Sequence, residues 1–201
     1  MKKKIVALCL VVGLLAVSVI GGTLAYFTDT GKAINTFTVG KVDITLDEAA
    51  TDLYGVAKED GSRVQLNKYK LVPGHTYVKD PTVTVSKDSE PCYVYVQVRN
   101  EIASVLEELV IDGDVWTAVD GVTDEGVQLF RHEAIMKANE QATLFNEFKV
   151  LTSADEDALD VGYQGKIVLN AYAIQAADLE NGETTADAAA VAYFNALNAK
   201  P

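Results

Sequence analysis

The sequence predicts an all-β protein: a jelly-roll-like antiparallel β-sandwich with one or two short helices, preceded by a signal peptide. Three observations predict this fold class. Apolar and polar side chains alternate with a period of two along most of the chain, which places successive side chains on opposite faces of a strand. Polar, turn-forming residues separate the alternating runs. The runs number about eight, as is typical of sandwiches and jelly rolls.

The clearest strand covers residues 92–99. It carries three valines on one face and mainly tyrosines on the other: Val94, Val96 and Val98 against Tyr93, Tyr95 and Gln97. Residues 82–85 alternate threonine with valine, and the polar residues 87–91 form a connection of hairpin length. We therefore expect residues 82–85 and 92–99 to pair as an antiparallel hairpin.

A turn and several further strands are expected elsewhere. The run Leu71-Val72-Pro73-Gly74 is typical of a turn, because proline fixes one φ angle and glycine accepts a positive one. Residues 48–61 are polar and rich in turn formers, which predicts a loop. Residues 37–46 also alternate, with a change of parity at Gly40-Lys41 that predicts a bulge or bend. Further strands are expected near residues 75–79, 115–119, 127–131, 148–151 and 166–175.

Two segments break the period of two. After Asn100, a good N-cap, apolar side chains recur at helical spacing over residues 102–109, which predicts a short helix. A second helix is predicted over about 185–197, where Ala190 and Phe194 belong to an apolar stripe. Such a stripe is more often a packing surface than a cofactor site.

The N-terminus has the composition of a signal peptide. Three lysines precede an uncharged apolar run over residues 5–20, and small residues follow it. Cleavage is expected between Ala25 and Tyr26, which divides the chain into a signal peptide (1–25) and one domain (26–201). The apolar run is shorter than the roughly 20 residues of a spanning helix, so removal is favoured over an uncleaved N-terminal anchor. The only expected contact with the membrane is through the signal peptide, before it is cleaved.

The chain is acidic, with a net charge of -12. Removal of the predicted signal takes away three lysines and no acid, which leaves 14 basic against 29 acidic side chains and a net charge of -15. The negative electrostatic potential of such a chain repels nucleic acid and anionic lipid. Nucleic-acid binding is therefore the least favoured function. The exposed carboxylates could attract divalent cations or basic partners.

The cysteines do not form a disulfide framework. Cys9 lies in the predicted signal, so Cys92 has no partner within the exported chain. Cys92 is in phase with the valines of the strand over residues 92–99, which favours a small buried apolar side chain over a catalytic thiol.

No complete catalytic motif is present. His132-Glu133 begins the zinc-peptidase pattern His-Glu-x-x-His, but Met136 stands where the second histidine would be. A serine nucleophile elbow and a phosphate-binding glycine loop are also missing from the sequence. We therefore assign no catalytic and no cofactor-binding residue, and the identity of any metal ligand stays open.

Calcium is the one ion that the acidic loops suggest. Asp112 and Asp114 flank a glycine, and four acids fall within residues 155–160. Neither group has the order of an EF-hand, and acidic loops in an acidic protein are usually only solvated.

The residues around the predicted cleavage site, Gly22-Thr23-Leu24-Ala25-Tyr26-Phe27-Thr28-Asp29, resemble the signal of TasA and camelysin-type proteins, which a SipW-like signal peptidase processes. The resemblance continues more weakly through residues 36–44, 71–74, 93–98 and 171–176. It implies a jelly-roll β-sandwich that a Gram-positive bacterium secretes to its surface or its extracellular matrix.

The resemblance implies two different functions. TasA builds biofilm matrix fibres, whereas camelysin is described as a cell-surface metalloendopeptidase that would need zinc. Because the chain lacks a complete zinc motif, we predict a non-enzymatic surface or matrix protein without a cofactor. A camelysin-like peptidase and a monomeric surface or spore-associated adhesin are the alternatives.

Residues 26–39 provide a physical route to fibres. The segment would follow the new N-terminus and carries the apolar residues Phe27, Ile34, Phe37 and Val39. We expect it to add as a strand to a neighbouring sandwich, so that copies self-associate head to tail. The alternative is that the same residues form the first strand of their own sheet.

Overall fold

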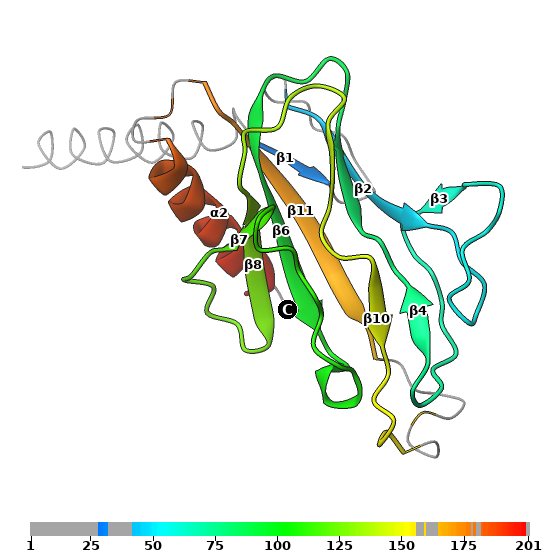
Figure 1. The fold of residues 1–201 in the computed structure, drawn as a ribbon. Coiled ribbons are helices and arrows are strands. Elements are labelled where there is room, and N and C mark those ends of the chain that lie inside the picture. Colours follow the sequence, from blue (N-terminus) through cyan, green and yellow to red (C-terminus); the bar gives the residue numbers. More distant parts are fainter. Residues whose placement is uncertain are drawn as a thin grey trace, which may run out of the picture.

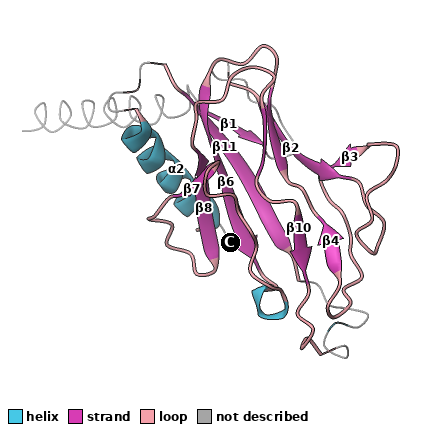
Figure 2. Ribbon diagram, in the orientation of Figure 1, coloured by secondary structure: helices cyan, strands magenta, loops and turns pink. Residues whose placement is uncertain are grey.

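The structure is a computed structural model of the chain, and it describes residues 28–31, 42–155, 159, 165–177, 179 and 182–199. Within these residues, antiparallel strands form two main layers, and one α-helix covers the outer face of one layer (Figure 1). Apart from this helix, most of the described residues lie in strands and loops (Figure 2). The prediction of an all-β antiparallel sandwich is confirmed.

The strands are short except for two that contain nine residues each. In chain order they are β1 (Thr28–Gly31), β2 (Ile44–Ala49), β3 (Arg63–Val64), β4 (Thr76–Val78), β5 (Thr82–Val85), β6 (Cys92–Asn100), β7 (Trp116–Ala118), β8 (Val127–His132), β9 (Gln141–Thr143), β10 (Glu147–Lys149) and β11 (Ile167–Gln175). The strands expected near residues 75–79, 115–119, 127–131, 148–151 and 166–175 are therefore present, with bounds that differ by a few residues.

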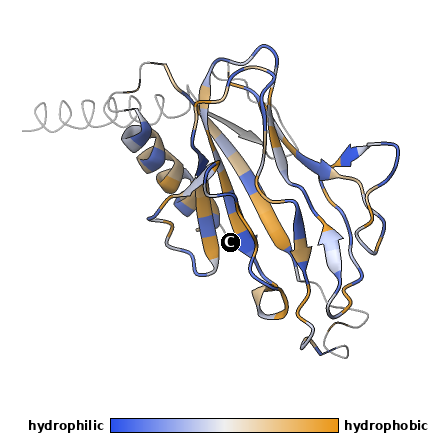
Figure 3. Ribbon diagram, viewed as in Figure 1, coloured by the Kyte–Doolittle hydropathy of each residue, from blue (hydrophilic) through white to orange (hydrophobic). Residues whose placement is uncertain are grey.

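Every pairing between the described strands is antiparallel. A five-stranded sheet has the order β1-β11-β6-β8-β7, and a four-stranded sheet has the order β3-β2-β5-β9. β4 and β10 form a separate pair. Hydrophobic residues concentrate in the long strands β6 and β11 and in β8 (Figure 3).

β6 and β11 form the centre of the five-stranded sheet. They pair over their full length, from Ile167 opposite Asn100 to Gln175 opposite Cys92. The valine face of β6 packs into the core between the two main sheets, together with Val83 and Val85 of the four-stranded sheet. The predicted alternation of residues 92–99 is confirmed, but both faces of the strand are buried.

The predicted hairpin between residues 82–85 and 92–99 is wrong. β5 pairs with β2 and β9, whereas β6 pairs with β11 and β8. The connection between β5 and β6 crosses from one sheet to the other, and the two strands face each other across the core. In this arrangement the valines of both strands are buried, because the valines of each strand point toward the opposite sheet.

The tyrosine face of β6 is covered by helix α2 (Glu183–Asn198). Ala186, Ala190 and Phe194 lie one turn apart and have no exposed surface. The two alanines let the helix approach the sheet closely, and Phe194 fills the remaining space against Tyr172. The prediction of a C-terminal helix with a packing stripe is confirmed.

The predicted helix over residues 102–109 is wrong. Only a single 3₁₀ turn forms, over Ala103–Val105. The Asn100 side chain does accept a hydrogen bond from the Ile102 amide, but the chain then becomes extended, and Leu106 forms an antiparallel bridge with Val150. Strand pairing here satisfies the backbone groups that a longer helix would have satisfied internally.

The turn over residues 71–74 is present. Gly74 has a φ of +75°, and the His75 amide donates to the Val72 carbonyl at 3.1 Å. The turn leads into β4, whose Tyr77 stacks on Phe148 of β10 with ring centroids 4.9 Å apart. These rings belong to a second, smaller apolar cluster beside the main core.

Candidate functional site

The first candidate site is the sheet edge at β1. β1 is the outermost strand of the five-stranded sheet and pairs antiparallel with β11, from Thr28 opposite Ile174 to Gly31 opposite Ala171. In Figure 1 it is the short blue strand that lies beside β11. A strand at an edge offers its second row of backbone groups to another chain.

The partner strand β11 is firmly held on its other side. It pairs with β6 over nine residues, and its residues 171–174 are buried between the core and α2. If β1 left this position, β11 would therefore keep its place and present an open edge. Such an edge can accept a strand from the same copy or from another copy.

The residues predicted to act at the N-terminus are only partly covered by the structure. The predicted cleavage residues Ala25 and Tyr26 lie outside the described residues. The predicted strand-exchange residues Phe27, Ile34, Phe37 and Val39 also lie outside them. The described part of the 26–39 segment is β1 itself, which takes a strand position in its own sheet.

The two histidines have separate structural surroundings. The His132 imidazole packs edge-on against Trp116 with ring centroids 5.2 Å apart, and its Nδ1 lies 2.7 Å from the Ala134 carbonyl oxygen. His75 packs against Tyr77, and its Nε2 lies 2.9 Å from the Tyr54 carbonyl oxygen. Met136, at the position of the missing zinc ligand, is buried in the core. Among the described residues, no three histidine, cysteine or acidic side chains converge as a metal site.

Cys92 is a buried core residue, as the sequence predicts. Its side chain has no exposed surface and lies among the valines of the sandwich core. Burial raises the pKa of the Cys92 thiol to about 12. The thiol is therefore protonated at neutral pH, which is the opposite of what a nucleophilic cysteine needs.

The acidic loops divide between described and undescribed residues. The Asp112 carboxylate accepts a hydrogen bond from the Asp114 amide at 2.9 Å, so it closes its own turn. Both aspartates are exposed. Residues 156–158 and 160 lie outside the described part of the chain. The calcium hypothesis stays a prediction.

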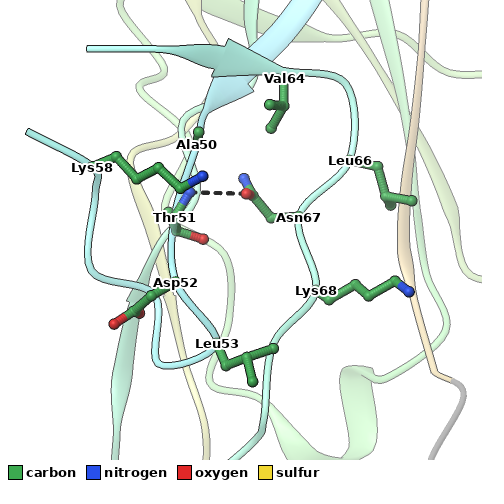
Figure 4. A pocket seen from close by; sticks show the side chains of 9 residues that line it. All are labelled: Ala50, Thr51, Asp52, Leu53, Lys58, Val64, Leu66, Asn67 and Lys68. Carbon is green, nitrogen blue, oxygen red and sulfur yellow. Dashed lines mark hydrogen bonds between the residues drawn. The ribbon is translucent and has the colours of Figure 1, made fainter. Parts of the chain in front are cut away.

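The second candidate site is a shallow hollow that the sequence interpretation missed. It lies in residues 50–72, here called the arm, which include β3 and project from the sandwich (Figure 1). The hollow has a volume of about 400 Å³. Nine side chains surround it, as Figure 4 shows: Ala50, Thr51, Asp52, Leu53, Lys58, Val64, Leu66, Asn67 and Lys68.

A polar network fixes the arm to the sandwich. Buried Glu48 of β2 forms an ion pair with Lys79, and the Asn67 amide group and backbone both donate to the Glu48 carboxylate. Arg63 of β3 bridges the carboxylates of Asp47 and Asp80. Residues 48 and 49 of the predicted loop 48–61 belong to β2, and the rest of that loop contains two turns. The hollow therefore has a defined shape.

The comparisons with known proteins give one match. The sequence model of the family described as camelysin metallo-endopeptidase matches residues 1–60. This match supports the resemblance in the N-terminal part of the chain, which includes the predicted signal, β1 and β2. Searches of curated proteins and of solved structures returned no match. Among the described residues, no helix has both the length and the apolar composition that crossing a membrane requires.

Proposed function

We propose that the chain is exported, loses residues 1–25 to a SipW-like signal peptidase, and works outside the bacterium as a surface or matrix protein whose copies join by strand exchange. The observation that carries the proposal is the position of β1. This strand begins three residues after the proposed cut and lies at the edge of a sheet, paired with β11.

Cleavage would act as the assembly switch. Before the cut, the apolar leader holds the segment 26–39 at the membrane. After the cut, the same segment can occupy the β11 edge of its own copy or of a neighbour, because the backbone hydrogen bonds are equivalent in both cases. Exchange that runs from copy to copy in one direction does not close, and it therefore produces filaments. The strong negative charge keeps separate chains soluble until they join.

Deletion of residues 26–39 from the exported chain is expected to abolish filaments, because the donor strand is lost while the β6–β11 centre remains. Electron microscopy measures the filaments, and circular dichroism checks that the sandwich is still folded. A synthetic peptide with the sequence of residues 26–39 should bind the deletion variant, and a scrambled peptide of equal composition should not. Filaments that persist in the folded deletion variant would refute strand exchange.

A camelysin-like metalloendopeptidase is the second candidate, and the family match over residues 1–60 favours it. This function would need zinc ligands beyond the groups that the structure brings together in its described part. Digestion of casein by the exported chain, with and without a chelator, separates the candidates. The structural proposal predicts no chelator-sensitive cleavage, and His132→Ala should behave as the parent chain does. Cleavage that the chelator abolishes and zinc restores would establish the peptidase.

A further inference from the structure

Most of the exposed large hydrophobic side chains of the described residues belong to the arm. Six large hydrophobic side chains are exposed among the described residues, and four of them belong to the arm: Leu53, Tyr54, Val56 and Leu66. Leu66 has 74% of its surface in contact with solvent and Val56 has 62%. Exposed apolar side chains that cluster in one fixed segment are typical of an interaction surface.

The hollow of the arm combines two of these exposed apolar side chains with positive charge. Lys58 and Lys68 line it beside Leu53 and Leu66 (Figure 4). The remaining charged side chain, Asp52, uses one carboxylate oxygen to accept the Tyr54 and Val56 amides of its own turn. Two lysines around an apolar surface fit a partner that is both acidic and apolar.

The same chain exposes a segment of this kind. Residues 107–114 have the sequence Glu-Glu-Leu-Val-Ile-Asp-Gly-Asp. Leu109 and Ile111 pack against the core, whereas Val110 is 83% exposed. Glu108 and Asp112 are exposed on either side of it. Val110 thus lies between two acids on an outer surface.

The two surfaces match in spacing as well as in charge. In the hollow, Lys68 follows Leu66 by two residues, and Figure 4 shows both side chains on the same side. In the acidic segment, Glu108 precedes Val110 by two residues. In an extended chain, residues two positions apart lie on the same face, about 7 Å from each other. Lys68 can therefore contact Glu108 while Leu66 contacts Val110.

The exposed parts of the two surfaces lie at different sheet edges, although Tyr69 and Leu71 of the arm and Leu109 of the segment pack on the same small apolar cluster. The arm surrounds β3, at one edge of the four-stranded sheet, whereas the segment 107–114 leads into β7, at one edge of the five-stranded sheet (Figure 1). A contact between them therefore joins two copies. Because the surfaces differ, each copy keeps one of each free, and the contact can repeat without closing.

We infer that the hollow of the arm in one copy receives the segment 107–114 of a second copy. This inference rests on the proposed self-association and gives it a second contact, which is independent of the N-terminal strand. Charge pairing at Lys58 and Lys68 selects this acidic segment, and burial of Leu66 and Val110 supplies the apolar part of the affinity.

Charge reversal tests the contact in the full chain, expressed with its own leader and recovered after export. Lys68→Glu and Glu108→Lys should each weaken self-association about tenfold, because each places like charges opposite each other. The chain that carries both reversals should associate within about twofold of the parent, since the pair is restored with opposite polarity. Lys87→Glu has the same charge change as Lys68→Glu at an exposed position outside the arm, and it should have little effect. Sedimentation velocity over a concentration series measures the association.

A zero-length carbodiimide cross-link between isotopically light and heavy copies adds a direct readout. Cross-links from Lys58 or Lys68 to the acids of residues 107–114 of the other copy are expected. An associating parent chain without these cross-links, or equal effects of Lys68→Glu and Lys87→Glu, would overturn the contact and leave strand exchange standing. A parent chain that stays monomeric at all concentrations would overturn both. Loss of filaments on deletion of residues 26–39, with the cross-links retained, would support two separate contacts.

Discussion

Replacement of Phe194 by alanine is expected to lower the free energy of unfolding by about 3 to 5 kcal/mol, since truncation of a buried phenylalanine loses its burial and leaves a cavity. Phe194 has no exposed surface and packs edge-on against Tyr172 and Tyr193, with ring centroids 5.9 and 5.1 Å away. Ala186 and Ala190 are too small to fill the space. The helix should therefore lose most of its hold on the sheet.

Urea unfolding followed by near-ultraviolet circular dichroism measures this effect, because the tyrosines beneath α2 report their own packing. Tyr54→Ala is the matched control: it also removes an aromatic ring, but Tyr54 is 47% exposed. Its cost should stay within about 0.5 kcal/mol, as for most surface substitutions. A Phe194→Ala chain with the stability of the Tyr54→Ala chain would show that α2 is not packed on the sheet in solution.

The burial of both faces of β6 shows what the local sequence pattern predicts and what it does not. Valine alternating with tyrosine predicts a strand and separates its two faces correctly. It does not reveal what covers the tyrosines, because a tyrosine can lie at a surface as well as in a core. The cover comes from α2, which is about 90 residues away in sequence, and only its alanine spacing indicates that it packs closely.

The wrong hairpin and the wrong helix have a common cause. The connection 86–91 is short enough for a hairpin, but it also suffices to cross between two sheets, and local sequence does not distinguish these paths. The partners of β5 and β6 come from distant segments. Likewise, the apolar spacing of residues 102–109 fits a helix, yet Leu106 pairs with Val150 instead. Long-range pairing overrides local preference in both places.

The arm was missed because residues 48–61 look like an ordinary polar loop. A signal was present, since Leu53, Tyr54 and Val56 interrupt the polar residues. Their positions depend on the Glu48–Lys79 ion pair and on the Asn67 hydrogen bonds, which hold the arm at the edge of the sandwich. These contacts join residues up to 31 positions apart. No local pattern predicts them.

Replacement of Asp187 by alanine is expected to cost about 2 to 3 kcal/mol, because it removes a shared partner of two groups beneath α2. The Tyr95 hydroxyl donates to Asp187 Oδ1 at 2.8 Å, and Arg131 Nε lies 3.3 Å from the same oxygen. Burial, and then the hydrogen bond to Asp187, raise the pKa of Tyr95, so this hydroxyl stays protonated and remains a donor. Arg131 is only 6% exposed, and its other carboxylate partner is Glu183 at 3.1 Å.

The loss at Asp187 should be recovered in large part when Arg131 is replaced by methionine in the same chain. The Arg131 side chain is buried, and without Asp187 its charge keeps only Glu183, whose side chain is 56% exposed. A buried charge that loses part of its pairing is costly, whereas a methionine of similar volume needs no charged partner. Asp124→Ala is the matched control, because Asp124 is about as exposed as Asp187, whereas its partner Arg99 is one-third exposed and Arg131 is buried. Its cost should be about 1 kcal/mol or less. If Asp187→Ala cost no more than Asp124→Ala in urea unfolding, the charges beneath α2 would contribute nothing to its position, and the aromatic packing around Phe194 would hold the helix alone.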